Sequence, residues 1–330
     1  MTDPALEAPP VVDDFPLETG NMLEEVLEGL QKRHKQLPCK LFYDERGSEL
    51  FSQICELQEY YPTRSKVDIM TRNVEEIVSL LGPGCLLIEY GSGTSEKSSI
   101  LLENLPQLAG YVPIDISREP LMAHASQMGE AYPHLDIFPI NADYNRPFPI
   151  PRTRKPVKKR VVYFPGSTIG NFHPPEAVEF LDRILRVCGS DGVLLIGVDL
   201  KKDPQILNLA YNDPGGITAE FNLNVLRRLN RELGADFDLD QFRHLAFYND
   251  DEGRMEMHLE SLRDQVVHLD GVNITFEKGE RIWTESSYKY TLERFEILAL
   301  DAGFAVQKVW TDGQDLFSVQ FLTPRSSGQG

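Results

Sequence analysis

The sequence predicts an α/β fold with a mostly parallel sheet and a second, smaller lobe. Between residues 85 and 200, short apolar runs alternate with stretches that have helical periodicity. The apolar runs, such as "CLLIEY" and "GVLLIGVDL", are continuous, which is typical of strands covered on both faces of a parallel sheet. Residues 201–285 break this rhythm, which indicates an inserted lobe.

Composition and charge restrict the classes of partner. The chain has 330 residues, with 33 Lys and Arg against 51 Asp and Glu, and a formal net charge of −18. Such a chain is repelled by phosphate backbones and anionic membranes, so we expect no nucleic acid and no membrane partner. The four cysteines form no C-x-x-C pair, and no apolar run reaches the roughly 20 residues of a membrane helix. We therefore expect a cytoplasmic protein with reduced thiols and no metal site.

The segment before residue 85 is predicted to be helical. Residues 1–17 are acidic and proline-rich, which favours disorder. "NMLEEVLEGLQKR" has apolar residues at helical spacing. "SELFSQICELQEYYPTRSKVDIMTRNVEEIVSLL" reads as two helices with a break at Pro62, because proline cannot continue the first helix. "PTRS" supplies candidate cap residues for the second helix.

From residue 85 the predicted elements follow in order. Strands are expected at "CLLIEY", "GYVPIDIS", "LDIFPINADY", "RVVYFPG" and "GVLLIGVDL", with helices at "SEKSSILLENL", "PLMAHASQMGEAY" and "PPEAVEFLDRILRVC". The insert contains a helical stretch, "GGITAEFNLNVLRRLNRELGADFDLDQF", and strands "RMEMHLESLRDQVVHL" and "VNITFEKGERI". A late helix, "TLERFEILALDAG", precedes strands "FAVQKVWTD" and "FSVQFLT", which can close the sheet with an antiparallel edge.

A glycine turn, "EYGSGTSEK", follows the first strand and opens a helix. Gly91 and Gly93 allow close approach of a ligand, and the helix start offers free N–H groups. The dinucleotide fingerprint fails because Glu96 stands at its third glycine, where an acid would repel a pyrophosphate. S-adenosylmethionine, which carries a cation and an amino acid group, fits better. Glu89 is either a second acid of this site or a buried acid that caps the loop.

Polar residues end the next two strands. Asp115 lies 24 residues after Gly91, at a strand tip where a carboxylate can accept both ribose hydroxyls. Asp143 and Tyr144 end the third strand, where an adenine would lie. One such acid alone is more often a helix cap or turn residue, but three strand ends in register favour a nucleoside site. Hydride transfer with NAD and a binding-only nucleoside sensor remain alternatives.

Longer motifs in the chain are similar to those of a known family. They are "LFYDERGSELFSQICELQEYYPTR", "EYGSGTSEK", "GSTIGNF", "AYND", "ADFDLDQF", "RMEMHL" and "WTESSYKY". With these motifs, the chain resembles the bacterial histidine Nα-methyltransferases of ergothioneine biosynthesis from about residue 20 to the end. The resemblance implies a class I (Rossmann-like) methyltransferase domain at 65–200 and 287–330. It also implies an α+β substrate-binding domain formed by 18–64 and 201–286.

The resemblance also implies the site residues. The family's contacts to S-adenosylmethionine fall on Tyr60, Gly91, Lys97, Asp115, Asp143 and Tyr144. Its contacts to the amino and carboxylate groups of the substrate fall on Tyr60, Asn171 and Tyr211, the implied catalytic set. Its imidazole contacts fall on Glu285 and Ser287, and the pocket lining on Tyr43, Phe51, Gly166, Thr168 and Met257. Tyr90 departs from the family, because an aliphatic residue is expected before the glycine turn.

The chemistry of these residues suits methyl transfer to an amine. The transfer is an in-line displacement, so the enzyme has to align a neutral amine with the methyl group. Asn171 and Tyr211 can bond a carboxylate without adding charge. A carboxylate at Glu285 favours a ring with a polar N–H edge, and Ser287 lies on the same face of an extended segment. From the residues alone, Asn171 could equally be a helix cap, and Tyr211 and Met257 could be core residues.

The sequence is thus interpreted as a monomeric, S-adenosylmethionine-dependent enzyme. It is expected to methylate the α-amino group of L-histidine three times, which gives hercynine. A thiolated histidine or tryptophan is the alternative acceptor, and an NAD-dependent oxidoreductase is the alternative from another class.

Overall fold

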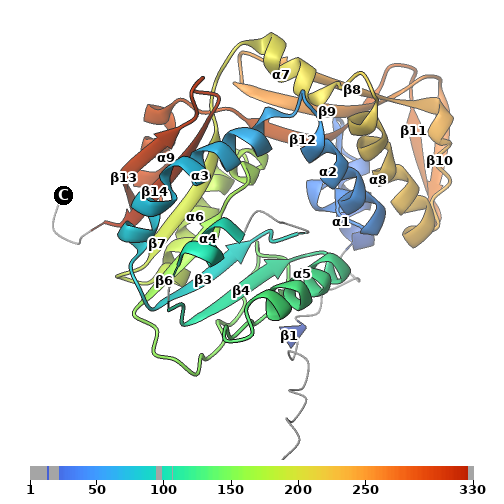
Figure 1. Cartoon of the computed structure of the whole chain (residues 1–330). Coiled ribbons are helices and arrows are strands. Elements are labelled where there is room, and N and C mark those ends of the chain that lie inside the picture. The colour runs from blue at the N-terminus through green and yellow to red at the C-terminus, as the bar shows by residue number, and fades with distance from the viewer. Residues whose placement is uncertain (1–12, 15–21, 94–98, 106, 326–330) are drawn as a thin grey trace, which may run out of the picture.

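A computed structural model describes residues 13–14, 22–93, 99–105 and 107–325 (Figure 1). The predicted disorder at 1–17 lies outside the described residues, apart from Asp13–Asp14, which form a two-residue strand. Two main sheets organise the chain. Figure 1 shows the larger sheet at the lower left and the smaller one, with β8, β9 and β12, at the upper right.

The larger sheet has eight strands in the order β1-β5-β4-β3-β6-β7-β14-β13. Their bounds are β1 Asp13–Asp14, β3 Cys85–Tyr90, β4 Gly110–Asp115, β5 Ile140–Asn141, β6 Lys159–Phe164, β7 Val193–Asp199, β13 Phe304–Thr311 and β14 Phe317–Pro324. The first six strands of this order are parallel, β14 runs antiparallel to β7, and β13 runs antiparallel to β14. The predicted parallel α/β sheet with an antiparallel edge is confirmed. Its strand order reverses between β3 and β6, where open α/β sheets bind ligands.

Helices cover both faces of this sheet. They are α3 Tyr61–Leu81, α4 Ser99–Asn104, α5 Arg118–Ala131, α6 Pro174–Cys188 and α9 Leu292–Asp301. Ile88 of β3 packs in one core with Phe180 of α6 and Phe295 of α9. The neighbouring Leu87 packs in a second core with residues of α3 and α4. This two-sided burial explains why the strands are continuously apolar.

The smaller sheet has the order β2-β12-β9-β8, with a separate hairpin of β10 and β11. Its strands are β2 Lys35–Gln36, β8 Phe242–Asn249, β9 Arg254–Ser261 and β12 Arg281–Tyr288, and the hairpin is β10 Gln265–Leu269 and β11 Val272–Phe276. Four helices, α1 Met22–Leu30, α2 Glu45–Glu56, α7 Pro204–Tyr211 and α8 Ile217–Leu233, and the short 3₁₀ helices η2 Cys39–Phe42 and η4 Leu239–Gln241 accompany these strands. Residues from before Tyr61 and after Asp203 share one apolar core here. No helix in the described ranges is long and apolar enough to cross a membrane.

Three local predictions were wrong. The helical stretch of the insert ends at Leu233, because Gly234 adopts a left-handed φ of 67°, and "FRHLAFYN" forms strand β8. "LDIFPINADY" contributes only the two residues of β5. Helix α3 has Tyr60 at its N-cap without a side-chain cap, so "PTRS" does not cap it. Ser65 of that motif instead donates a hydrogen bond to Asp312.

The two sheets meet at the ends of β7 and β12. The N–H of Tyr290 donates to the carbonyl of Asp199 at 3.0 Å, and the N–H of Lys201 donates to the carbonyl of Tyr290 at 2.8 Å. The 3₁₀ helix η3 Thr168–Asn171, which follows β6, packs on β12. A Cβ on Gly170 would lie 2.7 Å from the carbonyl oxygen of Tyr288, so a glycine is needed for this close approach.

Gly170→Ala should therefore push η3 away from β12. We expect a loss of about 1–3 kcal/mol in the free energy of unfolding, because the added methyl group meets backbone atoms that cannot rotate away. Gly129→Ala in α5 is the matched control, since its Cβ would meet nothing within 4 Å. That variant should be neutral or gain about 0.5–1 kcal/mol. Thermal unfolding of both variants tests this, and equal melting temperatures would contradict it.

Candidate functional site

The glycine turn lies at the carboxyl ends of β3 and β4. Gly91 has a φ of 71° and Gly93 a φ of 49°. Of the described residues, a Cβ on Gly91 would meet none within 4 Å, and one on Gly93 would meet only Oδ2 of Asp115, at 4.0 Å. No described residue therefore crowds the backbone at this turn. Lys97, a predicted cofactor contact, lies outside the described residues.

The carboxylate of Asp115 is fixed by backbone donors. Gly93 N–H donates to its Oδ2 at 2.8 Å, and Ser117 N–H donates to its Oδ1 at 2.8 Å. Burial raises the pKa of Asp115, and the two N–H groups oppose that shift. The N–H of Ile116 and the side chain of Ser117 also lower this pKa. Glu89 differs, because it is fully buried and accepts a hydrogen bond from the hydroxyl of Tyr111 on β4.

A group of packed aromatic rings follows the end of β5. Tyr144 stacks on Tyr90 with 5.5 Å between ring centroids and an interplanar angle of 25°. Tyr90 also contacts Phe148, Phe164 and Phe180, so the residue that departs from the family pattern packs directly against a predicted cofactor contact. Oδ1 of the neighbouring Asp143 accepts the N–H of Asn145 at 2.9 Å, and its Oδ2 lies 3.7 Å from Nζ of Lys40.

A second aromatic group lies on the segment before residue 61. The rings of Tyr43 and Phe51 meet edge to face at 5.7 Å, and Phe51 and Tyr60 do the same at 6.3 Å. Burial raises the pKa of Tyr43 and Tyr60 well above the usual tyrosine value, so both hydroxyls are protonated at neutral pH. These residues can supply a hydroxyl donor within an apolar surface.

The loop after β6 carries Gly166, Thr168 and Asn171. A Cβ on Gly166 would lie 3.1 Å from Oγ1 of Thr168, which explains the small residue there. The side chain of Asn171 lies near the thiol of Cys39 on η2 and lowers the pKa of that thiol. Burial raises the pKa of Cys39 to about 12, so the thiol stays protonated. Cys39 has no motif in the sequence that would have singled it out.

Strand β12 supplies the predicted ring contacts. Glu285 pairs in register with Met257 of β9, beside a bulge that separates it from Trp283. Burial raises the pKa of Glu285 to about 7, and nearby Lys289 pulls it down. Nε1 of Trp283 donates to the backbone carbonyl of Glu285 at 2.9 Å. Met257 is 2% exposed and belongs to the core of the smaller sheet.

A buried ionic group adjoins Ser287 and Tyr211. Nζ of Lys289 lies 2.8 Å from Oδ2 of Asp199 and donates to Oγ of Ser287 at 2.7 Å and to the hydroxyl of Tyr211 at 3.1 Å. Asp199 and Lys289 were not among the residues predicted from the sequence. Two signals were present, since Asp199 ends an apolar strand as Asp115 does, and Lys289 continues the alternation of Glu285 and Ser287.

Electrostatic effects on pKa show which of the predicted residues lie near one another. The charge of Glu285 raises the pKa of Cys39, Tyr43, Tyr60 and Tyr211, which come from separate segments. The charge of Tyr144 likewise raises the pKa of Tyr43. The two predicted halves are therefore neighbours.

Among the described residues, no group of three or more His, Cys, Asp or Glu side chains could hold a metal ion.

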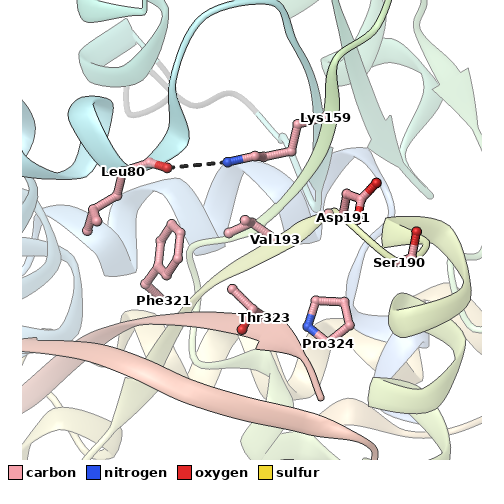
Figure 2. A pocket seen from close by; sticks show the side chains of 9 residues that line it. Leu80, Lys159, Ser190, Asp191, Val193, Phe321, Thr323 and Pro324 are labelled. Carbon is pink, nitrogen blue, oxygen red and sulfur yellow. Dashed lines mark hydrogen bonds between the residues drawn. The ribbon is translucent and has the colours of Figure 1, made fainter. Parts of the chain in front are cut away.

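A surface depression of about 380 Å³ lies at the opposite edge of the larger sheet (Figure 2). Its lining includes Leu80, Lys159, Asp191, Val193 and Phe321, near the amino ends of β6 and β7. Nζ of Lys159 donates to the carbonyl of Leu80 across it at 3.4 Å, as the dashed line in Figure 2 shows. None of the predicted site residues lines this depression.

Comparisons with known proteins agree with the fold and the motifs. The family described as "Histidine-specific methyltransferase, SAM-dependent" matches residues 22–324. The "Histidine N-alpha-methyltransferase" of Mycobacterium tuberculosis is 41% identical over 294 residues, which cover 87% of this chain and 90% of that protein. The protein of the same name from Mycolicibacterium smegmatis is 40% identical with the same coverage. "Ergothioneine biosynthesis protein 1" of Neurospora crassa is 34% identical over 288 residues, 85% of this chain and 32% of that protein.

The larger sheet is the class I methyltransferase sheet, with β14 inserted antiparallel between β7 and β13. With a family match from residue 22 to residue 324, the chain belongs to the histidine-specific, S-adenosylmethionine-dependent methyltransferases.

Proposed function

We propose that the chain transfers three methyl groups from S-adenosylmethionine to the α-amino nitrogen of L-histidine. The product is hercynine, and the reaction is the first step of ergothioneine biosynthesis. Glu285 carries the choice of acceptor, because it is a half-buried carboxylate whose charge acts on Tyr43, Tyr60 and Tyr211. A ring N–H is the kind of donor that such a carboxylate favours.

The cofactor half consists of the glycine turn and the next two strand ends. The cofactor supplies an electrophilic methyl group on a sulfonium. Gly91 leaves room for it, Asp115 accepts its ribose hydroxyls, and Asp143 and Tyr144 border its adenine. The position of Asp115 at the glycine turn, where it accepts the N–H of Gly93, supports this assignment. Lys97 is assigned to the cofactor half from the family resemblance alone.

The acceptor half holds the amino acid for in-line attack. Asn171 and Tyr211 bond the carboxylate, Tyr60 bonds the amine, and Glu285 and Ser287 bond the two ring nitrogens. Tyr43, Phe51, Gly166, Thr168 and Met257 line the pocket. Protonated tyrosines suit this role: Tyr211 donates to the carboxylate, Tyr60 accepts from an amine N–H and leaves the nitrogen lone pair free, and neither adds negative charge beside the amine.

The domain arrangement belongs to the same proposal. Residues 65–200 and 287–330 are assigned to the methyltransferase domain, and 18–64 and 201–286 to the substrate-binding domain. The shared core of α1, α2, α7, α8 and the smaller sheet supports this division. All four cysteines are free thiols, which agrees with the proposed cytoplasmic location. We propose a monomer as the working unit.

A product screen tests the function. The protein is incubated with S-adenosylmethionine and each common amino acid separately, and the products are read by mass spectrometry. Trimethylated histidine alone is the expected result. Methylated tryptophan, or methylation only of a thiolated histidine added as a further acceptor, would retain the cofactor site but overturn the assignment of Glu285 and Ser287. Binding of NAD without methyl transfer would overturn the proposal as a whole.

Asp115→Ala should weaken the cofactor. The loss of a charged acceptor costs about 1–3 kcal/mol, or roughly 5- to 150-fold in Kd for S-adenosylhomocysteine. Asp191→Ala is the control, since Asp191 is exposed at the remote depression of Figure 2. Calorimetric titration measures both variants. An unchanged Kd for Asp115→Ala would remove this residue from the ribose site.

The raised pKa of Glu285 makes stability depend on pH. Between about pH 4.5 and pH 7 the folded protein keeps a proton on Glu285 that the unfolded chain has lost, so stability falls as pH rises. Glu285→Gln removes this loss. Its advantage in unfolding free energy over wild type should grow by on the order of 1–3 kcal/mol from pH 5 to pH 8.

Thermal unfolding without ligands at both pH values tests this prediction. Glu277→Gln, an exposed glutamate in the loop before β12, is the matched control and should show no such change. A difference between wild type and Glu285→Gln that stays constant with pH would contradict the raised pKa of Glu285.

A further inference from the structure

Lys289 and Asp199 form an ion pair that is hidden from solvent. The side chain of Lys289 is 0% exposed and that of Asp199 is 1% exposed. A buried ion pair is retained at low cost only when its remaining hydrogen-bonding groups have partners. The ammonium of Lys289 meets this condition, because it has three acceptors: Asp199 Oδ2, Ser287 Oγ and the Tyr211 hydroxyl.

This arrangement fixes the direction of hydrogen bonding at two hydroxyls. A lysine ammonium donates three hydrogen bonds and accepts none. Tyr211 and Ser287 must therefore both accept from Lys289, and neither can give it a hydrogen. The two hydroxyls are also near each other, since both accept from the same ammonium. A hydrogen bond between them would use only one of their two hydrogens, so at least one O–H is left to donate to a ligand.

The charge of Lys289 also strengthens that donor. Hydrogen bonds in a chain polarise one another, and the effect is larger where the surroundings exclude water. Tyr211 is 8% exposed and Ser287 is 4% exposed. A polarised O–H with a cation behind it prefers an ionised acceptor to a neutral one. A carboxylate is the ionised acceptor that an amino acid offers.

We propose that Lys289 is a positioning residue for the carboxylate of the substrate. It holds the Tyr211 hydroxyl as a donor toward the carboxylate and the Ser287 hydroxyl as a donor toward the ring, so the site distinguishes an amino acid from the same amine without a carboxylate. The inference rests on the proposed function, which makes histidine the amino acid. Asp199 in turn holds Lys289, and it is shared with Lys202 at 2.6 Å and with the hydroxyl of Tyr61 at 2.8 Å.

The test compares histidine with histamine, which keeps the ring and the amine but lacks the carboxylate. Both are titrated calorimetrically in the presence of S-adenosylhomocysteine. We expect Lys289→Met and Tyr211→Phe each to lower the ratio of histidine affinity to histamine affinity at least tenfold. In the double variant the ratio should fall no more than threefold further, because Lys289 acts through the hydroxyl that is already gone. If the fold-losses of the two single variants multiply in the double variant, Lys289 has a merely structural role, and the proposal is overturned.

Lys202→Met is the matched control. It removes a cation from the same carboxylate, but Lys202 contacts Tyr61 and not the two hydroxyls. The ratio should change less than threefold. An equal fall in Lys202→Met and Lys289→Met would mean that charge alone sets the preference, and would overturn the positioning role.

Folding and function are checked separately. Affinity for S-adenosylhomocysteine and the melting temperature show whether each variant is folded. If Lys289→Met does not fold, Tyr211→Phe still tests the proposal. An unchanged ratio of histidine affinity to histamine affinity in Tyr211→Phe overturns it. Wild-type protein that binds histidine, with an unchanged ratio in Lys289→Met, would overturn this inference alone. Wild-type protein that binds no histidine would overturn the proposed function with it.

Discussion

The join between the two sheets depends on the buried ion pair of Asp199 and Lys289. Asp199 ends β7 in the larger sheet, and Lys289 follows β12 in the smaller one. Their 2.8 Å contact lies beside the backbone bonds of Tyr290 that link the same two chain segments. A buried charge without its partner is costly, so neither segment can move away alone. Tyr211 and Ser287 contact the same ammonium, so these two residues of the proposed acceptor half lie where the two sheets meet.

The site is assembled from segments that are distant in the chain. Cys39, Tyr43 and Tyr60 come from before the larger sheet, Asn171 from a loop within it, and Glu285 from the returning strand β12. The glycine at position 170 lets that loop touch β12, which brings Asn171 toward the same centre as Glu285. The proposed choice of acceptor thus depends on how the lobes meet, while the proposed cofactor half is local to three consecutive strand ends. This division explains why a glycine turn could be found in the sequence more easily than a ring-binding pocket.

The sequence predicted the features that depend on local rules. Continuous apolar runs predicted the parallel strands, because residues such as Leu87 and Ile88 face two different cores. Asp115 was found because a strand end fixes its position. Strand β8 was missed because its burial does not alternate cleanly, and a helical stretch precedes it. Lys289 was missed because its partner Tyr211 is 78 residues away, and only the fold brings them together. The role of each site residue came from the family resemblance and not from its pattern.

The tryptophans give the acceptor half a built-in optical signal. The chain has two, and Trp310 lies on β13, where its indole N–H donates to Glu76. Trp283 instead donates to the backbone carbonyl of Glu285, and the guanidinium of Arg254 lies 4.5 Å from its ring. Its emission therefore depends on the position of the backbone of Glu285, the residue that is proposed to bond the acceptor ring. With Trp310 replaced by phenylalanine, the emission of the whole protein would come from that single indole, and occupancy of the acceptor half could be followed in real time without a label.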